Sequence, residues 1–197
     1  MLSIIIIMYL LIICILLTTG NNMFSRERYI VNDCNSIYYE PNKWHKKNVQ
    51  QYNNCYSYAI NKIDPSLKQK PYPGYFSGND RKYQKTWGCD ILNDMMKKDI
   101  PEIHEIQGDQ KCPCGFHKIM LFVDDHGSKK DFHYYRQDFP DSWSHKPGSN
   151  KVTKYDRNGN LIYDPIMANR DYRINNKESS GFNYNKFCGQ FCVKNSN

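Results

Sequence analysis

The cysteines constrain the fold of this chain more than any other feature. Of its eight cysteines, Cys14 lies in an apolar leader and the other seven lie in the polar remainder. In a secreted chain, cysteines pair as disulfides, and an odd number leaves one thiol over. Six are expected to pair, and they are Cys34, Cys89, Cys112, Cys114, Cys188 and Cys192. The cysteine left over is Cys55.

The disulfide pairing cannot be deduced from spacing alone. A natural arrangement joins the CPC segment, residues 112–114, to the terminal pair Cys188 and Cys192, and joins Cys34 to Cys89. Zinc is the competing explanation, because these two short segments hold four sulfur atoms. The spacings C-x-C and C-x3-C differ from the paired C-x2-C pattern of structural zinc sites, so we expect disulfides and no metal.

Residues 1–20 form the leader, which is mostly apolar, carries no charged side chain and gives way at once to GNNMFSRERY. It is either a signal peptide, cut near small residues at 18–20, or an uncleaved anchor, since about 17–20 apolar residues can span a bilayer. Both interpretations place the domain outside the cell or in a lumen, as a secreted or membrane-anchored protein, unless the anchor inserts in the inverse orientation. Arg26 and Arg28 favour the inverse orientation of an anchor.

Residues 21–197 fit one domain. The net charge of +7 favours acidic partners such as anionic cell-wall polymers, although a basic surface also serves solubility alone. The lysines are scattered and form no long run, which favours the solubility interpretation. No nucleic-acid partner is expected for a secreted, disulfide-rich chain. With 16 Tyr and 3 Trp, aromatic side chains are available to build the core.

Two helices are expected in the first half of the domain, after an irregular arm over residues 21–50. Residues 54–63 have an apolar stripe, a cap at Asn53 or Asn54, and a stop at Asp64-Pro65. Residues 86–98 repeat this helical spacing.

The second half has the period of strands. Strands are expected over residues 117–123, 132–137, 142–146 and 186–193, with a hairpin of 152–155 and 161–163 around Asn158-Gly159. Helices followed by an antiparallel sheet indicate the α+β class.

Cys55 is the candidate nucleophile, because it opens its predicted helix. A helix N-terminus lowers the pKa of a thiol, and a thiolate then needs a base that is oriented by a third group. His133 is the candidate base, and His145 should lie close to it on the same face of a hairpin. Gln51, with Gln50, is a candidate for the oxyanion hole. A buried structural Cys and a satisfied strand His are the competing interpretations.

These segments carry a resemblance to a known family. NNCYSYAIN, DFHYYRQD and WSHKPG resemble the compact papain-like hydrolases of the NlpC/P60 and CHAP types, and also uncharacterised bacterial and viral proteins. The resemblance implies a papain-like fold, with Cys55 as nucleophile, His133 as base and His145 as third residue. The chain departs from the family patterns D-C-x-G-[LF] and G-H-V.

Two functions from different classes follow. One is a cysteine peptidase or amidase that acts without a cofactor on a peptide, peptidoglycan or acyl substrate. The other is a disulfide-stapled surface module that binds through the aromatic segment YFSGNDRKYQKTW, residues 75–87, and performs no chemistry.

Overall fold

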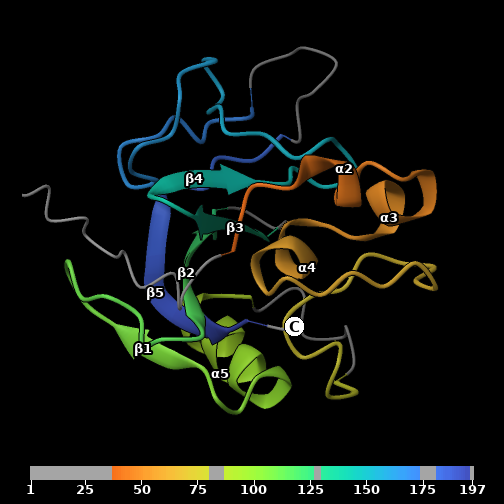
Figure 1. Ribbon diagram of the computed structural model, residues 1–197, viewed down its shortest axis with the longest axis horizontal. Helices are drawn as coiled ribbons and strands as arrows, with labels where there is room; N and C mark the ends of the chain where they lie inside the picture. Colours follow the sequence, from red (N-terminus) through yellow and green to blue (C-terminus); the bar gives the residue numbers. More distant parts are fainter. Residues whose placement is uncertain (1–36, 80–86, 127–129, 174–180, 196–197) are drawn as a thin grey trace, which may run out of the picture. The chain divides into compact units, whose positions relative to one another are not determined.

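A five-stranded antiparallel sheet forms the centre of the computed structural model (Figure 1), in the order β1-β5-β2-β3-β4. The sheet confirms the α+β class and four of the expected strands. Its strands are β1 His104–Ile106, β2 Phe116–Asp124, β3 Asp131–Asp138, β4 Ser142–His145 and β5 Lys186–Lys194.

The structure describes residues 37–79, 87–126, 130–173 and 181–195, all within the unit Cys34–Asn197. The expected leader, residues 1–20, and Cys34 lie outside these ranges, so the predictions made for them stay predictions. Within the described ranges, no helix combines the length and the apolar character needed to cross a bilayer.

Four helices precede or flank the sheet in the described residues, and their bounds are α2 Pro41–Trp44, α3 Lys47–Tyr52, α4 Cys55–Ala59 and α5 Cys89–Asp99. The cap of α4 is Asn54, whose side-chain oxygen accepts hydrogen bonds from the N–H groups of Tyr56 and Ser57. The helix ends earlier than expected, because Asn61 adopts a φ of 53°, in the left-handed region.

The expectation of an irregular arm over residues 21–50 is corrected where the structure describes it. The arm contains α2 and α3, of 4 and 6 residues. Helices this short show too few residues for an apolar period to emerge in the sequence. The expected hairpin at 152–163 is reduced to an isolated bridge between Tyr155 and Leu161.

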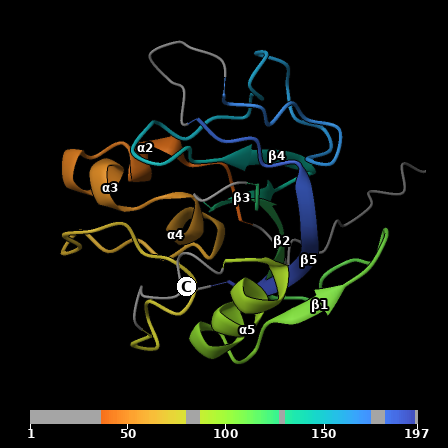
Figure 2. The same ribbon diagram turned by 180° about the vertical axis from the view of Figure 1, so that it is seen from behind.

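The sheet is buried on both faces, and β2 shows this most clearly. Ile119, Leu121 and Val123 contact the main core with α4 and α5, while Met120 and Phe122 belong to a second cluster. The second cluster is completed by Ile162, Tyr172 and Tyr184, which come from the segments after β4. In both views α4 and α5 lie to the same side of β2 and β5 (Figure 2).

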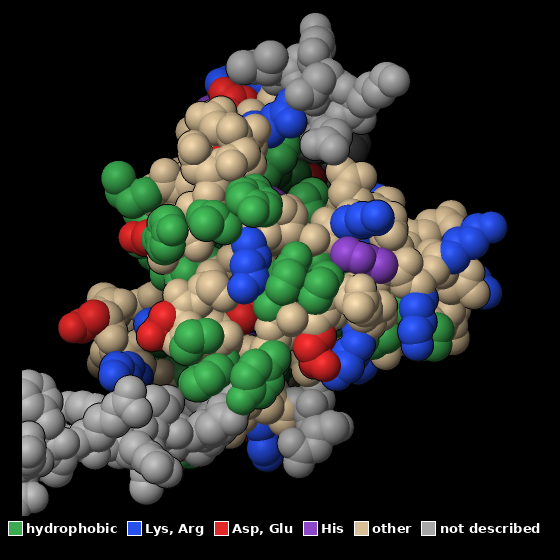
Figure 3. Space-filling model, turned by 45° about the horizontal axis from the view of Figure 1, so that its top comes forward, with side chains coloured by type: hydrophobic (Ala, Val, Ile, Leu, Met, Phe, Trp, Pro, Cys, Tyr) green, Lys and Arg blue, Asp and Glu red, His purple; other side chains and the backbone are tan. Residues whose placement is uncertain are grey.

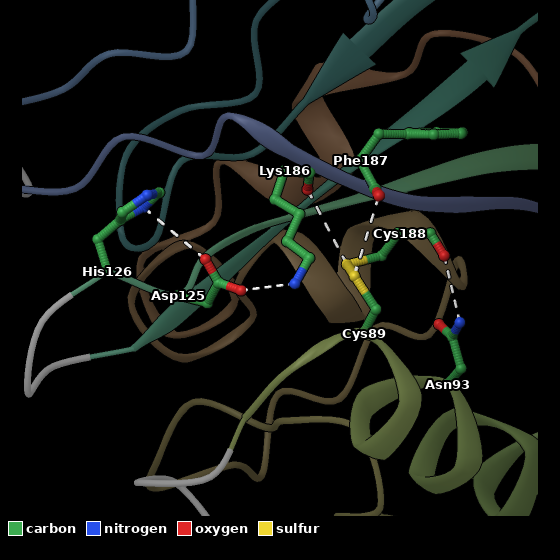
Figure 4. Close-up of a disulfide and its surroundings, with 7 residues drawn as sticks. All are labelled: Cys89, Asn93, Asp125, His126, Lys186, Phe187 and Cys188. Atoms are coloured by element: carbon green, nitrogen blue, oxygen red, sulfur yellow. Dashed lines mark hydrogen bonds and ion pairs between the residues drawn. A yellow bond between two sulfur atoms is a disulfide. The ribbon is translucent and has the colours of Figure 1, made fainter.

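Two disulfides within the described residues join the middle of the chain to β5. Cys112–Cys192 confirms the expected link between the CPC segment and the terminal pair. The expected Cys34–Cys89 bond is wrong, because Cys89 pairs with Cys188, and this bond ties the first residue of α5 to β5 (Figure 4). Beside it, Asn93 Nδ2 donates to the Cys188 carbonyl at 3.2 Å. Cys114 is also disulfide-bonded.

A buried guanidinium connects β3 to the helical layer. Arg136, 1% exposed, donates to Asp138 Oδ1 at 2.8 and 3.0 Å. It also donates to the hydroxyl of Tyr58 in α4 at 2.8 Å and to Asn61 Oδ1 at 3.3 Å. Ser144 on β4 donates in turn to Asp138 Oδ2. One charged group therefore joins two strands and a helix.

We expect Asp138→Asn to lower the free energy of unfolding by about 3–5 kcal/mol, because the Arg136 charge would stay buried without its carboxylate. Urea unfolding followed by circular dichroism measures this change. The control is Asp141→Asn, which removes the same charge from an exposed position in the β3–β4 turn and should shift the value by less than about 0.5 kcal/mol. Equal values for the two variants would contradict the role assigned to this pair.

Candidate functional site

Cys55 is the first residue of α4 and is enclosed by the core. Its side chain is 4% exposed, and it is the free cysteine of the described residues. The thiol donates to the carbonyl oxygen of Phe132 on β3, with 3.8 Å between Sγ and oxygen. The prediction of an unpaired thiol at the start of a helix is therefore confirmed.

The pKa of this thiol is raised, whereas the sequence predicted a lowered pKa. Burial raises the pKa of Cys55 to about 12, which outweighs the backbone groups of Tyr134 on β3 and Tyr56 in the first helical turn that lower it. Asp131 adds to the increase. At neutral pH the sulfur is therefore a protonated thiol, and the protonated form is not a nucleophile.

His133 lies on the other face of β3 from Cys55. Side chains alternate along a strand, so Phe132 and Tyr134 face α4 and belong to the same core cluster as Cys55. The ring of His133 instead packs against Tyr135 and Tyr184, with ring centroids 5.0 and 5.2 Å apart. The structure thus separates the expected nucleophile and base by the thickness of the sheet.

His133 and His145 do meet, as the hairpin predicted. His145 pairs with Tyr135, which is two residues from His133 along β3. Both rings therefore lie on the same face of the sheet. His133 Nε2 is 2.7 Å from His145 Nδ1, and His145 Nε2 is 2.9 Å from the carbonyl oxygen of Tyr155. Because a carbonyl only accepts, His145 carries its proton on Nε2, and His133 Nε2–H donates to His145 Nδ1.

Burial keeps these imidazoles neutral. It lowers the pKa of His145 to about 4 and the pKa of His133 well below its ordinary value, with His145 as a second cause for His133. His117 on β2 behaves alike: burial lowers its pKa to about 4, and its Nε2 lies 2.6 Å from the carbonyl oxygen of Ala59. A general base near neutral pH needs a higher pKa than these rings have.

The three buried histidines predict unfolding in mild acid. The pKa of each folded imidazole lies below its unfolded value of about 6.5, so only the unfolded chain takes up these protons as the pH falls from 6.5 to 4. The free energy of unfolding should therefore decrease in this window, by up to about 4 kcal/mol per pH unit for three protons. Urea unfolding at pH 4.5, 5.5 and 6.5 measures the slope. A free energy of unfolding independent of pH over this window would contradict the burial of neutral rings.

Gln51 is at the surface, whereas Cys55 is buried. The Gln51 side chain is exposed, and its Nε2 donates to the hydroxyl of Tyr52 at 3.1 Å. It lines a cavity of about 450 Å³ together with His45, Lys47, Gln50 and Ser149, and Cys55 is not part of that lining. The expected oxyanion residue is thus not placed beside the expected nucleophile.

Lys146 is a buried charged group that sequence reasoning missed. Its Nζ donates to the carbonyl oxygens of Gln50 at 2.7 Å and Gly148 at 2.8 Å, and burial lowers its pKa to about 7. Nothing in the segment SHKPG distinguishes this lysine from the exposed lysines elsewhere. Its burial depends on the docking of α3, which the sequence did not predict.

The sulfur atoms proposed for the zinc alternative are used elsewhere. Cys112, Cys188 and Cys192 are in disulfides, which leaves them without the thiolate that zinc requires. Across the described part of the chain, no group of three or more His, Cys, Asp or Glu side chains is arranged to hold a metal ion.

The comparisons with known proteins give a family. Over 135 residues the chain is 30% identical to insoluble matrix shell protein 1 of Ruditapes philippinarum, a match that covers 68% of this chain and 82% of the relative. The chain belongs to the family of this protein. No family model matches the chain, and no solved structure does. Within the insoluble matrix shell protein 1 family, the resemblance to papain-like hydrolases stays a prediction.

Proposed function

We propose that this protein is a secreted, disulfide-stapled domain that binds and assembles in an extracellular matrix and performs no catalysis. The observation that carries the proposal is the separation of Cys55 and His133 onto opposite faces of β3. Both groups are buried, and their pKa values move away from those of a thiolate and a general base. The kinship with insoluble matrix shell protein 1 supports the same conclusion.

The disulfides support an extracellular location. Disulfides form and persist in oxidising compartments, and these two enclose 99 and 80 residues of sequence. Constraints of this length stabilise a domain mainly by restricting its unfolded chain. A matrix component has to persist outside the cell, and such cross-links serve that need.

Exposed apolar side chains in the segment after β4 support binding. They are Tyr155, Leu161, Tyr163, Ile166 and Met167, with Tyr163 79% and Met167 82% exposed. This segment lies at the top of Figure 1, and Figure 3 turns that side toward the reader, with several hydrophobic side chains on the face. Such side chains could contact a partner, and contiguous exposed apolar surface marks interaction sites.

The recognition surface expected at residues 75–87 is corrected by the burial of its described aromatic side chains. Trp87 is 2% exposed and packs in the main core, and Tyr75 and Phe76 are half-buried against that core. Residues 80–86 lie outside the described ranges. The aromatic side chains of this segment that the structure describes therefore serve mainly to build the core.

The alternative is the cysteine hydrolase of the papain-like resemblance. It would require α4 to move so that Cys55 leaves the core and meets an imidazole. The charge of Lys146 lowers the pKa of the Cys55 thiol, but burial raises that pKa by more, and Asp131 raises it further.

The proposal predicts where the secreted protein partitions. The full chain, expressed in a secreting cell line, should be recovered mainly in the extracellular fraction that resists salt and mild detergent. Cys55→Ala should partition in the same way, because the thiol does no chemistry in this account. The double variant Cys89→Ala/Cys188→Ala should lose that retention, because its fold loses about 2–5 kcal/mol of stability.

Immunoblots of the medium and the insoluble fraction measure the partition, and circular dichroism confirms that Cys55→Ala is folded. Recovery of the wild type from the medium alone would overturn the matrix role. A Cys55-dependent cleavage of peptide or amide substrates by the secreted protein would establish the hydrolase instead.

A further inference from the structure

The cavity beside α3 is lined by polar side chains. It has a volume of about 450 Å³, and its lining residues are His45, Lys47, Gln50, Gln51 and Ser149. Each of these has at least one nitrogen or hydroxyl group that can donate a hydrogen bond. The lining contains no carboxylate.

The surroundings of this cavity are also positive. The pKa of His45 is lowered by burial and then by the charges of Lys151 and Lys146. Lys70 extends the cluster, because its charge lowers the pKa of Lys146 and its Nζ approaches Gly148. In Figure 3 several Lys and Arg side chains lie on the side of the molecule where Figure 1 shows α2 and α3. Such a concentration of charge attracts anions.

The donors are held in place by the chain itself. Gln50 Nε2 donates to the Ser149 carbonyl at 3.2 Å, and the buried Lys146 Nζ donates to the Gln50 carbonyl at 2.7 Å. The N–H of Val152 donates to His45 Nε2 at 3.2 Å. Because that nitrogen accepts, the neutral ring carries its proton on Nδ1, which makes His45 a donor.

We propose that this cavity binds the oxyanion group of an acidic extracellular polysaccharide, a sulfate ester or a carboxylate. Lys47 and His45 receive the anionic oxygens, and the side-chain amides of Gln50 and Gln51 contact neighbouring hydroxyl groups. The cavity is open to solvent, so a sugar ring can lie over its lining beside a charged substituent. The proposal rests on the proposed matrix function, because it names the ligand of that binding domain.

The test compares two neighbouring lysines. Lys47→Gln removes a charge from the lining, while Lys46→Gln removes the same charge one residue away, from an exposed position outside the lining. Isothermal titration of the full chain uses three oligosaccharides of similar length: a sulfated heparin-type tetrasaccharide, a carboxylated tetragalacturonate, and neutral chitotetraose. The sulfated and carboxylated arms distinguish the two sources of oxyanion.

We expect at least one acidic oligosaccharide to bind and chitotetraose not to bind. Lys47→Gln should weaken that binding about tenfold, as expected for the loss of one charge-assisted hydrogen bond, and Lys46→Gln by less than about twofold. Equal losses for the two variants, binding of the neutral sugar with similar affinity, or no binding of either acidic sugar would each overturn the proposal.

The oligosaccharide titration and the partitioning experiment can fail independently of each other. If insoluble partitioning persists in Lys47→Gln and no acidic oligosaccharide binds, the ligand assignment fails and the matrix function stands. If partitioning fails in the wild type, the matrix function fails whatever the oligosaccharides do.

Discussion

The buried guanidinium of Arg136 fixes the arrangement on which the other features depend. Its hydrogen bonds to Asp138 neutralise the charge within β3, and its bonds to the hydroxyl and carbonyl of Tyr58 hold α4 against that strand. An unpaired charge at 1% exposure would cost several kcal/mol, so this set of partners is specified strongly. Docking α4 in this position places Cys55 directly over the Phe132 carbonyl.

The alternation of side chains along β3 then decides the chemistry. Arg136 faces α4, and Tyr134 and Phe132 face it too, because residues two apart share a face. The odd-numbered positions, His133 and Tyr135, must therefore face the second cluster, where His145 and Tyr184 receive the imidazole. Because α4 packs on one face of β3, Cys55 and His133 lie on opposite faces and cannot form a Cys–His pair. Both residues are side chains of the core.

Much of the fold could be predicted from the sequence, and the reason is local. The strand β2 contains an apolar run, β3 contains the aromatic residues Phe132, Tyr134 and Tyr135 between polar ends, and Asn54 is a cap whose partners lie within three residues. The contact of His133 with His145 followed from hairpin geometry alone.

What could not be predicted depends on tertiary packing. The sequence shows that Cys55 opens a helix and that His133 lies in a strand, but not which face of the strand the helix covers. The burial of Lys146 depends on α3, a helix of 6 residues without a full apolar period. The partner of Cys89 was missed for the same reason, since α5 had to be placed beside β5 before Cys188 came within reach.

The family and the site together describe a domain that is stapled and filled on both faces of its sheet. Its exposed features include apolar side chains around Tyr163 and a polar cavity that contains Lys47, and neither contains the thiol or the paired histidines. The binding that we propose at this surface agrees with kinship to insoluble matrix shell protein 1.

The most direct test of this account is the rate of iodoacetamide labelling of Cys55 in the folded, unreduced protein from pH 5 to 9, read by mass spectrometry. We expect negligible labelling across this range and rapid labelling only after unfolding in urea, because the buried thiol keeps its proton up to a pKa of about 12. Rapid labelling near pH 6 that is lost in His133→Ala would contradict the account and would establish an activated Cys–His pair.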